Sequence, residues 1–353
     1  MDLKNTRFFG SKSKTITSQQ VVAEVPANDS LWQILEVNHG EVDHYQVLSS
    51  SDRPGGDVDV LDTADGAQTY LEHLTEFGEV TGDLSGTRAV PLGADQSNTS
   101  LVVDDAWILK VFRKLEEGLN PDVELLSQIA NCPHVAGVRG YLTRNGCTLA
   151  MMQEFISGGR DGFKLALDPG LDNEGDLGAA IRVVHEDLAA AFGTTEVPGS
   201  HIRASLNAHL DQILTQTDAL AEFEGNLREI YSRIPDAPVA IQRIHGDLHL
   251  GQTLLADKWY LIDFEGEPAR PLEQRRLPDH PLRDVAGMVR SFGYAHAMGG
   301  QADVDKLLAG YGVEPDPILD AYIADKAAYE VVYEANNRPD WVEIPLSAIR
   351  ELV

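Results

Sequence analysis

The sequence predicts an α+β fold in which a β-rich N-terminal part precedes a larger helical part. Short apolar runs separated by turn signals recur up to about residue 157, and apolar residues at helical spacing dominate from residue 158 onward. The 353 residues are enough for two domains, or for one domain with a substantial subdomain. We therefore expect a small N-terminal cap over residues 1–78, a β-rich lobe over 79–157 and a helical lobe over 158–353.

The N-terminal part is expected to hold several strands and one helix. A turn at Asp104-Asp105 separates two strands, and a helix begins at Pro121 behind Asn120 as its N-cap. The segment 49–56 has the composition of a surface loop. The predicted strands are 32–37, 44–48, 99–103, 106–112, 135–142 and 148–155.

The C-terminal part is expected to be mainly helical. Helical spacing covers residues 175–194 and 205–234, and it resumes at Asp284. Between these helices, residues 241–264 carry short apolar runs instead. This change of pattern draws attention to the segment that holds the most informative motif.

The charge balance restricts the partners of the protein. Lys and Arg number 28 against 56 Asp and Glu, a net charge of -28. Such an acidic surface repels nucleic acids and anionic membranes, so we expect neither as a partner. A nucleotide remains compatible, because a metal ion and a few cations reverse the local sign within a cleft.

Cysteine usage and hydropathy predict a cytoplasmic protein. Only Cys132 and Cys147 are present, without metal-ligand spacing, which is typical of a reducing compartment. No apolar run reaches membrane-spanning length, and residues 1–14 lack the apolar core of a signal peptide.

Two neighbouring motifs carry the chemistry of phosphoryl transfer. Ile244–Gln252 reads IHGDLHLGQ, and Tyr260–Glu265 reads YLIDFE. Phosphoryl transfer needs a carboxylate for the proton of the acceptor hydroxyl and oxygen ligands for Mg²⁺ at the phosphates. Asp247 suits the first role, and Gln252 and Asp263 suit the second. Their spacing is similar to the Asp-x-x-x-x-Asn and Asp-Phe-Gly pair of protein-kinase-like enzymes, with Gln in place of Asn and Glu265 in place of Gly.

Two histidines accompany Asp247. His245 is expected to be a packed loop residue. For His249, packing and a role toward the substrate both stay open.

Lys110 is a charge within a predicted strand, which is costly to bury without a partner. A lysine at this place would contact ATP phosphates and pair with a helix carboxylate, for which Glu124 is the candidate. A solvated edge lysine is the alternative. The turn at 93–100 could cover the phosphates, although it matches no glycine-rich phosphate motif.

A second polar cluster lies near the C-terminus. Glu330, Glu334 and Asn337 share one helical face, and Trp341 follows a proline. Carboxylates beside an aromatic plate suit a sugar. A solvated acidic face on a terminal helix is an equally good interpretation.

Arginines gather after Asp263, at Arg270, Arg275, Arg276 and Arg283. We expect structural ion pairs for them. Asp284, near the start of a helix, is expected to act as a cap or a loop anchor.

At these residues the sequence resembles the maltokinases of actinobacteria, a branch of the aminoglycoside-phosphotransferase-like kinases. The pair HGDLHLGQ and IDFEGEP is the most specific part, whereas HGD alone marks only the superfamily. The similar segments are 7–12, 110–115, 118–124, 152–156, 161–163, 245–252, 262–272, 283–292 and 329–345.

This resemblance implies a bilobal protein-kinase-like fold with an N-terminal cap, and ATP-dependent, Mg²⁺-requiring phosphorylation of maltose to maltose 1-phosphate for α-glucan (glycogen) synthesis. It implies Asp247 as base, Gln252 and Asp263 as metal ligands, and Lys110 with Glu124 on the nucleotide side. The adenine would be held by Gln153, Glu154 and Ile156, and the sugar by the tentative set His249, Glu265, Glu330, Glu334 and Trp341. A link to an enzyme that interconverts trehalose and maltose would follow.

The acceptor is nevertheless left open by the sequence. This chain is shorter than is general for the family, and a related group phosphorylates glucosamine with the same catalytic motifs. We therefore keep three hypotheses: a maltokinase, a glucosamine or other small-sugar kinase, and a catalytically silent binding protein on the same fold.

Overall fold

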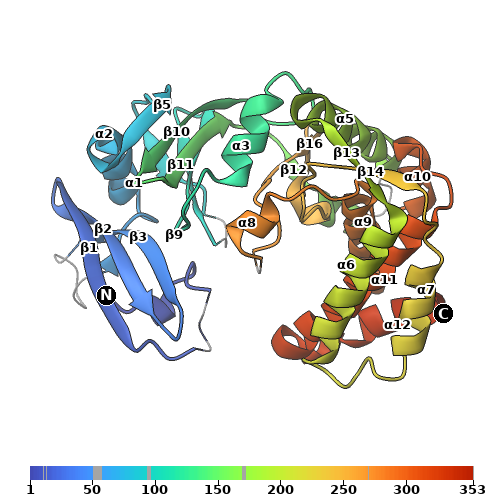
Figure 1. The fold of residues 1–353 in the computed structure, drawn as a ribbon. Coiled ribbons are helices and arrows are strands. Elements are labelled where there is room, and N and C mark those ends of the chain that lie inside the picture. The colour runs from blue at the N-terminus through green and yellow to red at the C-terminus, as the bar shows by residue number, and fades with distance from the viewer. Residues whose placement is uncertain are drawn as a thin grey trace. The chain divides into compact units, whose positions relative to one another are not determined.

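The computed structural model describes residues 1–10, 12, 14–50, 58–93, 97–168, 172–268 and 270–352, and it divides the chain into two compact units (Figure 1). Unit 1 comprises Met1–Ala130 and Ala136–Ser157, and unit 2 comprises Asn131–Val135 and Gly158–Val353. The predicted α+β class is confirmed, because most strands lie in unit 1 and most helices in unit 2. The boundary predicted after residue 78 stays a prediction.

Unit 1 contains two antiparallel sheets. The first has the order β1-β2-β3-β4, with β9 also paired to β3. Its strands are Ser18–Ala27, Ser30–Asn38, Val42–Ser50, Val58–Asp59 and Lys114–Leu115. The second has the order β5-β10-β11-β8-β7-β6. In chain order its strands are Glu79–Gly82, Ala89–Pro91, Thr99–Val103, Trp107–Val111, Val138–Arg144 and Cys147–Glu154.

Helices join these sheets into one core. Trp32 and Leu48 of the first sheet pack in the same cluster as Leu109 and Met152 of the second. A further cluster, which includes Phe9, covers the other side of the first sheet. The helices of unit 1 are η1 Leu3–Asn5, α1 Ala64–Glu72, α2 Leu74–Phe77 and α3 Pro121–Gln128.

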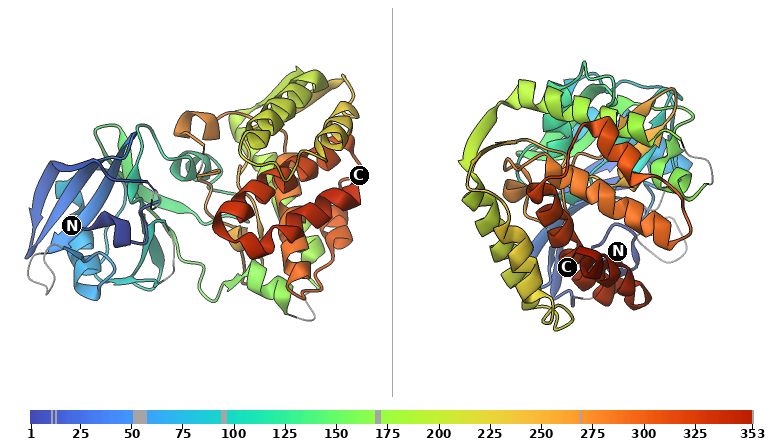
Figure 2. Two further views of the ribbon diagram at one scale, coloured as in Figure 1. Left: turned by 90° about the horizontal axis from the view of Figure 1, so that it is seen from below. Right: turned by 90° about the vertical axis from the view of Figure 1, so that its right-hand side faces the viewer.

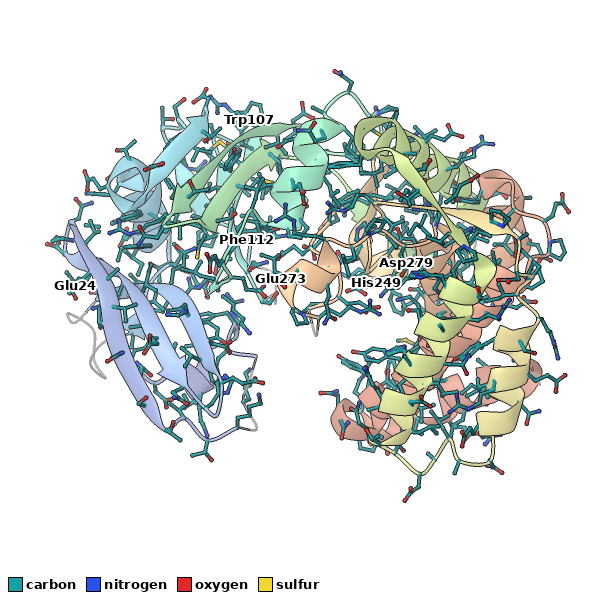
Figure 3. The ribbon with its side chains drawn as sticks, viewed as in Figure 1. Glu24, Trp107, Phe112, His249, Glu273 and Asp279 are labelled. Carbon is teal, nitrogen blue, oxygen red and sulfur yellow. The ribbon has the colours of Figure 1, made fainter. Side chains whose placement is uncertain are left out.

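The predicted strands of unit 1 are confirmed with shifts of a few residues at some ends. The β7–β8 turn holds Asp104 and Asp105 at positive φ, of 51° and 56°, as the sequence pattern indicates. Trp107 begins β8, and Phe112 directly follows it (Figure 3). Residues 51–56 of the predicted loop, and residues 94–96 of the turn that could cover the phosphates, lie outside the described residues.

Unit 2 is built mainly of helices, with two small antiparallel sheets, β12-β15-β16 and β13-β14. The strands are β12 Arg160–Asp161, β13 Thr194–Pro198, β14 Pro238–Gln242, β15 Thr253–Leu255 and β16 Trp259–Leu261. The helices are α4 Gly162–Leu167, α5 Glu174–Phe192, α6 Gly199–Leu214, α7 Glu224–Ser232, η2 Leu250–Gln252, α8 Leu272–Arg275, α9 Leu282–Ala297, α10 Val304–Tyr311, α11 Pro317–Asn337, η3 Pro339–Trp341 and α12 Glu343–Leu352.

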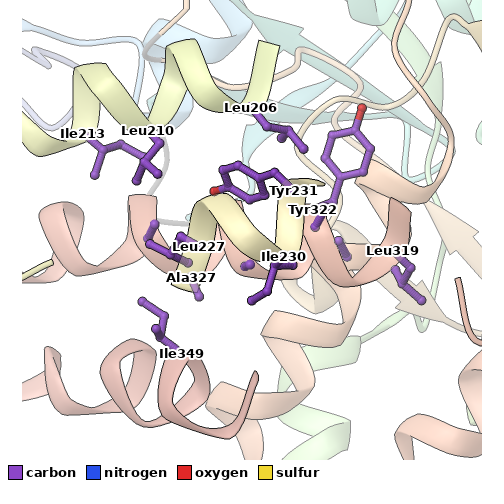
Figure 4. Close-up of a cluster of buried hydrophobic side chains, with 14 of the residues drawn as sticks. Leu206, Leu210, Ile213, Leu227, Ile230, Tyr231, Leu319, Tyr322, Ala327 and Ile349 are labelled. Atoms are coloured by element: carbon purple, nitrogen blue, oxygen red, sulfur yellow. The ribbon is translucent and has the colours of Figure 1, made fainter. Parts of the chain in front are cut away.

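The core of unit 2 forms around α11. Helices α6, α7, α9 and α12 contact it (Figure 2). Leu210 of α6, Leu227 of α7, Ala327 of α11 and Ile349 of α12 belong to one buried cluster (Figure 4). Burying this apolar surface, at about 25 cal/mol per Å², holds α11 firmly, which matters because α11 carries several site candidates.

One predicted helical segment is in fact two helices. The spacing predicted helix over 205–234, but α6 ends at Leu214 and α7 begins at Glu224. Thr217 accepts a hydrogen bond through Oγ1 from the backbone N–H of Ala219. Side-chain hydrogen bonds of this kind compete with helix continuation, and the apolar spacing alone could not show the break.

Candidate active site

Asp247 lies in the loop between β14 and η2, and this loop is tied to α9. Asp284, in the first turn of α9, accepts hydrogen bonds from the backbone N–H groups of His245 (2.8 Å) and Gly246 (2.9 Å). His185 Nε2 lies 3.1 Å from the same carboxylate. Asp284 is only 1% exposed. Burial favours the neutral acid, but the hydrogen bonds from His185 and from the backbone N–H of Gly246 lower the pKa of Asp284 below its usual value. The predicted loop anchor is confirmed.

The side chain of His245 holds the loop from its other side. It is buried, its Nε2 lies 2.9 Å from the carbonyl oxygen of Ile262, and its ring packs on Phe264 at 4.5 Å. His245 is therefore a packed loop histidine, as predicted. It joins the Asp247 loop to the segment that carries Asp263.

Gln252 and Asp263 are brought together by the β15–β16 hairpin. The backbone N–H of Ile262 donates to the carbonyl of Gln252 at 3.0 Å, and Gln252 Nε2 donates to Asp263 Oδ2 at 2.9 Å. Asp263 has a φ of 68°, a left-handed conformation that is uncommon for residues other than glycine and clusters at functional sites.

This pair fits a magnesium ion. Mg²⁺ takes oxygen ligands at about 2.0–2.1 Å in octahedral geometry, so adjacent ligand oxygens lie about 3 Å apart. In the structure a hydrogen bond of 2.9 Å from Gln252 Nε2 to Asp263 Oδ2 holds the two side chains side by side. A half-turn of the amide would present its oxygen instead of its nitrogen, so the donor set present suits the ion.

The electrostatic setting of Asp247 is unusual for an aspartate. Burial is the largest influence and raises its pKa to about 6. The nearby positive charge of Lys326 opposes this rise, whereas Glu267 and Asp263 reinforce it. A carboxyl group with this pKa is mostly ionised at neutral pH yet well matched to exchange protons, which is typical of a general base.

His249 is neutral near pH 7. Burial, the largest influence, and the charges of His245 and Lys326 lower its pKa to about 4. Its Nδ1 accepts a hydrogen bond from the backbone N–H of Gly251 at 3.1 Å, so the proton of the neutral ring is on Nε2. The ring lies directly before η2 (Figure 3), and Nε2–H can donate to a ligand oxygen.

In unit 1, Lys110 is buried and paired, so the solvated edge lysine is excluded. Its Nζ lies 2.8 Å from Asp122 Oδ2, and the two residues are 7% and 0% exposed. The predicted partner was Glu124, two residues further along α3. Asp122 is thus a carboxylate partner of Lys110 that the sequence did not single out, and the pairing of Lys110 with Glu124 stays a prediction.

The start of α3 is as predicted. Asn120 caps the helix by accepting through its side chain from the backbone N–H of Asp122 at 2.8 Å, and Pro121 is the first helical residue. Asp122 thereby lies in the first turn, where the helix dipole favours a carboxylate.

The predicted adenine-binding residues lie at the end of β11 and directly after it. Gln153 and Glu154 close the strand opposite Ile108 and Trp107 of β8. Oε1 of Gln153 is buried and has no hydrogen-bond partner within the described residues. The role of Gln153, Glu154 and Ile156 stays a prediction.

The C-terminal cluster comes together on α11, α9 and η3. Arg290 donates to Glu330 Oε2 through Nε (2.9 Å) and Nη2 (2.7 Å). Glu334 is 1% exposed and accepts from Tyr294 and Arg338. The idea of a solvated acidic face is wrong, because α9 covers Glu330 and Glu334 and the apolar parts of both helices hold them there.

Trp341 belongs to the same cluster. Its ring stacks on Tyr294 at 6.2 Å, and the guanidinium of Arg338 lies 4.4 Å from it. Glu265 lies just after Asp263, and its backbone carbonyl accepts from Arg275 at 3.1 Å. Sugar binding by these residues stays a prediction.

Two charged residues near Asp247 were not named from the sequence. Lys326 of α11 donates to Glu267 at 3.2 Å, and Glu267 is also paired with Arg270 and Arg283. Arg270 and Arg283 thus form the structural ion pairs that were expected. Glu267 belongs to the IDFEGEP motif, which was a signal for it, whereas nothing local marks Lys326 on its helix.

One protein family matches the part of the chain that contains most of the candidate site residues. Residues 88–317 match the model of the phosphotransferase enzyme family APH, a stretch that contains Lys110, Asp247 and Asp263. The chain belongs to this family.

Individual relatives are similar over most of the chain. A glucosamine kinase of Mycolicibacterium smegmatis is 26% identical over 315 residues, which cover 74% of this chain and 79% of the relative. A glucosamine kinase of Streptacidiphilus jiangxiensis is 23% identical over 345 residues, which cover 81% and 77%.

Among solved structures, a glucosamine kinase in complex with glucosamine, ADP and inorganic phosphate superimposes with a TM-score of 0.70 at 18% identity, covering 98% of this chain and 96% of the other. Crystal form B of glucosamine kinase gives 0.73 with the same identity and coverage. These structures support the fold, which is that of the kinase-like phosphotransferases. No described helix is long and apolar enough to cross a membrane.

Proposed function

We propose that this protein is an ATP-dependent, magnesium-requiring kinase whose acceptor is a hydroxyl group of a small sugar. The observation that carries the proposal is the anchored loop of Asp247 beside the Gln252–Asp263 pair, within a chain of the phosphotransferase family. A base and a set of oxygen ligands joined by one hairpin are what this chemistry requires.

In the proposed mechanism, Asp247 orients the acceptor hydroxyl and takes its proton as phosphoryl transfer proceeds. Gln252 and Asp263 would hold Mg²⁺, which when bound would neutralise charge on the phosphates. Lys110, kept in place by Asp122, contacts the phosphates of the nucleotide. Most of the catalysis then comes from positioning and electrostatics.

Glucosamine is the acceptor that the relatives favour. Both sequence relatives described above are glucosamine kinases and match more than three quarters of their own length. The net charge of -28 agrees with a cationic acceptor, because a negative field attracts an amino sugar.

Maltose is a second candidate, and a specific observation favours it. Glu330 and Glu334 are already paired with Arg290 and Arg338, so their cluster offers little uncompensated charge for an ammonium group. The ring of Trp341 suits the CH face of a neutral sugar. The similarity of HGDLHLGQ and IDFEGEP to maltokinases points the same way, and with it to a link with an enzyme that interconverts trehalose and maltose.

An acceptor panel tests the proposal. Purified protein is incubated with ATP, Mg²⁺ and glucosamine, maltose, glucose, trehalose or an aminoglycoside, and ADP release is measured. We expect release that depends on a sugar and is abolished by EDTA. The sugar with the highest kcat/KM identifies the acceptor. If ADP release is absent with every sugar, the silent binding protein is the correct hypothesis and the kinase proposal is wrong.

A further inference from the structure

Lys326 is a cation whose charge acts on Asp247, and neither the motifs nor the family match gives it a role. It projects from the middle of α11, and its side chain is only 15% exposed. Its Nζ donates to Glu267 Oε1 at 3.2 Å. A long, flexible side chain that is held at its charged end loses little further entropy when it acts on a neighbour.

The path of this side chain is set by a glycine of α9. A Cβ on Gly287 would lie 3.2 Å from Lys326 Cε and 2.4 Å from the carbonyl oxygen of Leu248. The stem of Lys326 and the backbone that follows Asp247 therefore meet at the same point of α9. This geometry delivers the ammonium group to the Asp247 loop from a helix distant in sequence.

The ion pair with Glu267 compensates the positive charge of Lys326 only in part. Glu267 also lies 2.7 Å from Arg270 Nε and 2.9 Å from Arg283 Nη2, and Arg283 has a second carboxylate partner in Asp279 at 3.0 Å, so two carboxylates face three cations. Part of the positive charge is thus available to Asp247. In agreement, the charge of Lys326 lowers the pKa of Asp247, and that of Asp247 raises the pKa of Lys326.

We propose that Lys326 is a positioning residue for Asp247: anchored by Glu267 and guided past Gly287, its ammonium group holds the Asp247 carboxylate in the orientation that receives the acceptor hydroxyl. The inference rests on the proposed function, in which Asp247 is the base. Its physical basis is that misplacing a catalytic group by about 1 Å costs up to about 100-fold in rate.

The first test compares Lys326→Met with Lys326→Arg. Methionine removes the charge from an unbranched side chain, and we expect kcat to fall about 10- to 100-fold while KM for ATP changes less than about 3-fold. Arginine keeps the charge and should recover part of the loss. Lys306→Met is the matched control, because Lys306 pairs with Asp172 on the exposed surface of the same unit; its kcat should equal that of the wild type.

The second test asks whether Lys326 acts through Asp247. In single-turnover assays, Asp247→Asn/Lys326→Met should be no slower than Asp247→Asn alone, because residues that act as a unit are not additive. Should Lys326→Met fail to fold in a thermal melt, Glu267→Gln replaces it, with the same selective loss of kcat expected.

The outcomes separate the two proposals. An active wild type whose kcat is unaffected by Lys326→Met, or whose losses multiply in the double variant, overturns the role of Lys326 alone. A wild type that releases no ADP with any sugar overturns the proposed function and this inference together.

Discussion

The surroundings of Asp247 raise its pKa and make its charged form a cost to the stability of the folded protein. Burial raises its pKa to about 6, and Lys326 limits the rise. Above pH 6 the side chain of Asp247 is charged. Water hydrates this charge poorly in the folded protein and fully in the unfolded chain. Functional groups of this kind commonly reduce the stability of the fold.

Asp247→Asn should therefore stabilise the protein at pH 7.5 in the absence of nucleotide and metal. Because the pKa is higher in the folded state, the wild type binds more protons than its unfolded chain between about pH 4 and 6, and its stability falls as the pH rises through this window. Asparagine avoids that loss. We expect a gain of about 1–2 kcal/mol at pH 7.5, allowing for partial solvent exposure, and a smaller gain at pH 5. Thermal unfolding at both pH values measures it, and a lower Tm for the variant at pH 7.5 would contradict the account.

At the scale of residues, the sequence predicts those features that depend on neighbouring residues in the chain. The cap at Asn120, the buried state of His245 and the candidate set Asp247, Gln252 and Asp263 all follow from short motifs. The pairing of Lys110 with Asp122 was not predicted, because a separation of twelve residues has no recognisable motif until the start of the helix is fixed. The pairing of Lys110 with Glu124 stays a prediction.

The elements that build the site are a loop, a hairpin and two helices. Asp284 of α9 anchors the Asp247 loop, the β15–β16 hairpin brings Gln252 to Asp263, and α11 supplies Lys326. Helix α9 is central because it contacts both the loop and α11. Its glycine at position 287 is needed for this close approach and not for an unusual φ.

Two glycines of α9 provide a matched pair for testing this packing. Gly287→Ala places a methyl group 2.4 Å from the carbonyl oxygen of Leu248, so we expect a loss of several kcal/mol or of folding. Gly293→Ala meets only Arg290 Nη1, at 3.5 Å, and should stabilise the helix by about 0.5–1 kcal/mol. Urea unfolding measures both variants. Equal stability of the two would show that α9 does not press on the loop at this point.

At the scale of elements, apolar spacing predicts which segments are helical but not where a helix is interrupted. The helix predicted over 205–234 breaks between α6 and α7 at a polar stretch. The contribution of α11 to the surroundings of Asp247 was also beyond the sequence, since contacts between residues about 80 positions apart depend on how the helices pack.

The whole molecule combines a β-rich unit that carries Lys110 with a helical unit that carries the Asp247 loop. The family match spans residues 88–317, so it includes parts of both units. The predicted fold class is confirmed, while the division at residue 78, the site roles and the expected cytoplasmic location stay predictions. The maltokinase resemblance identified the superfamily correctly, whereas the two sequence relatives described above are glucosamine kinases.

The most direct test of the central claim is sugar-dependent ADP release by the wild type and by Asp247→Asn at saturating ATP and Mg²⁺, with nucleotide affinity measured in parallel. The account predicts a fall in kcat of about 10²- to 10⁴-fold, the usual contribution of a general base, with ATP affinity changed by less than about 3-fold. An Asp247→Asn variant that releases ADP as fast as the wild type would contradict it.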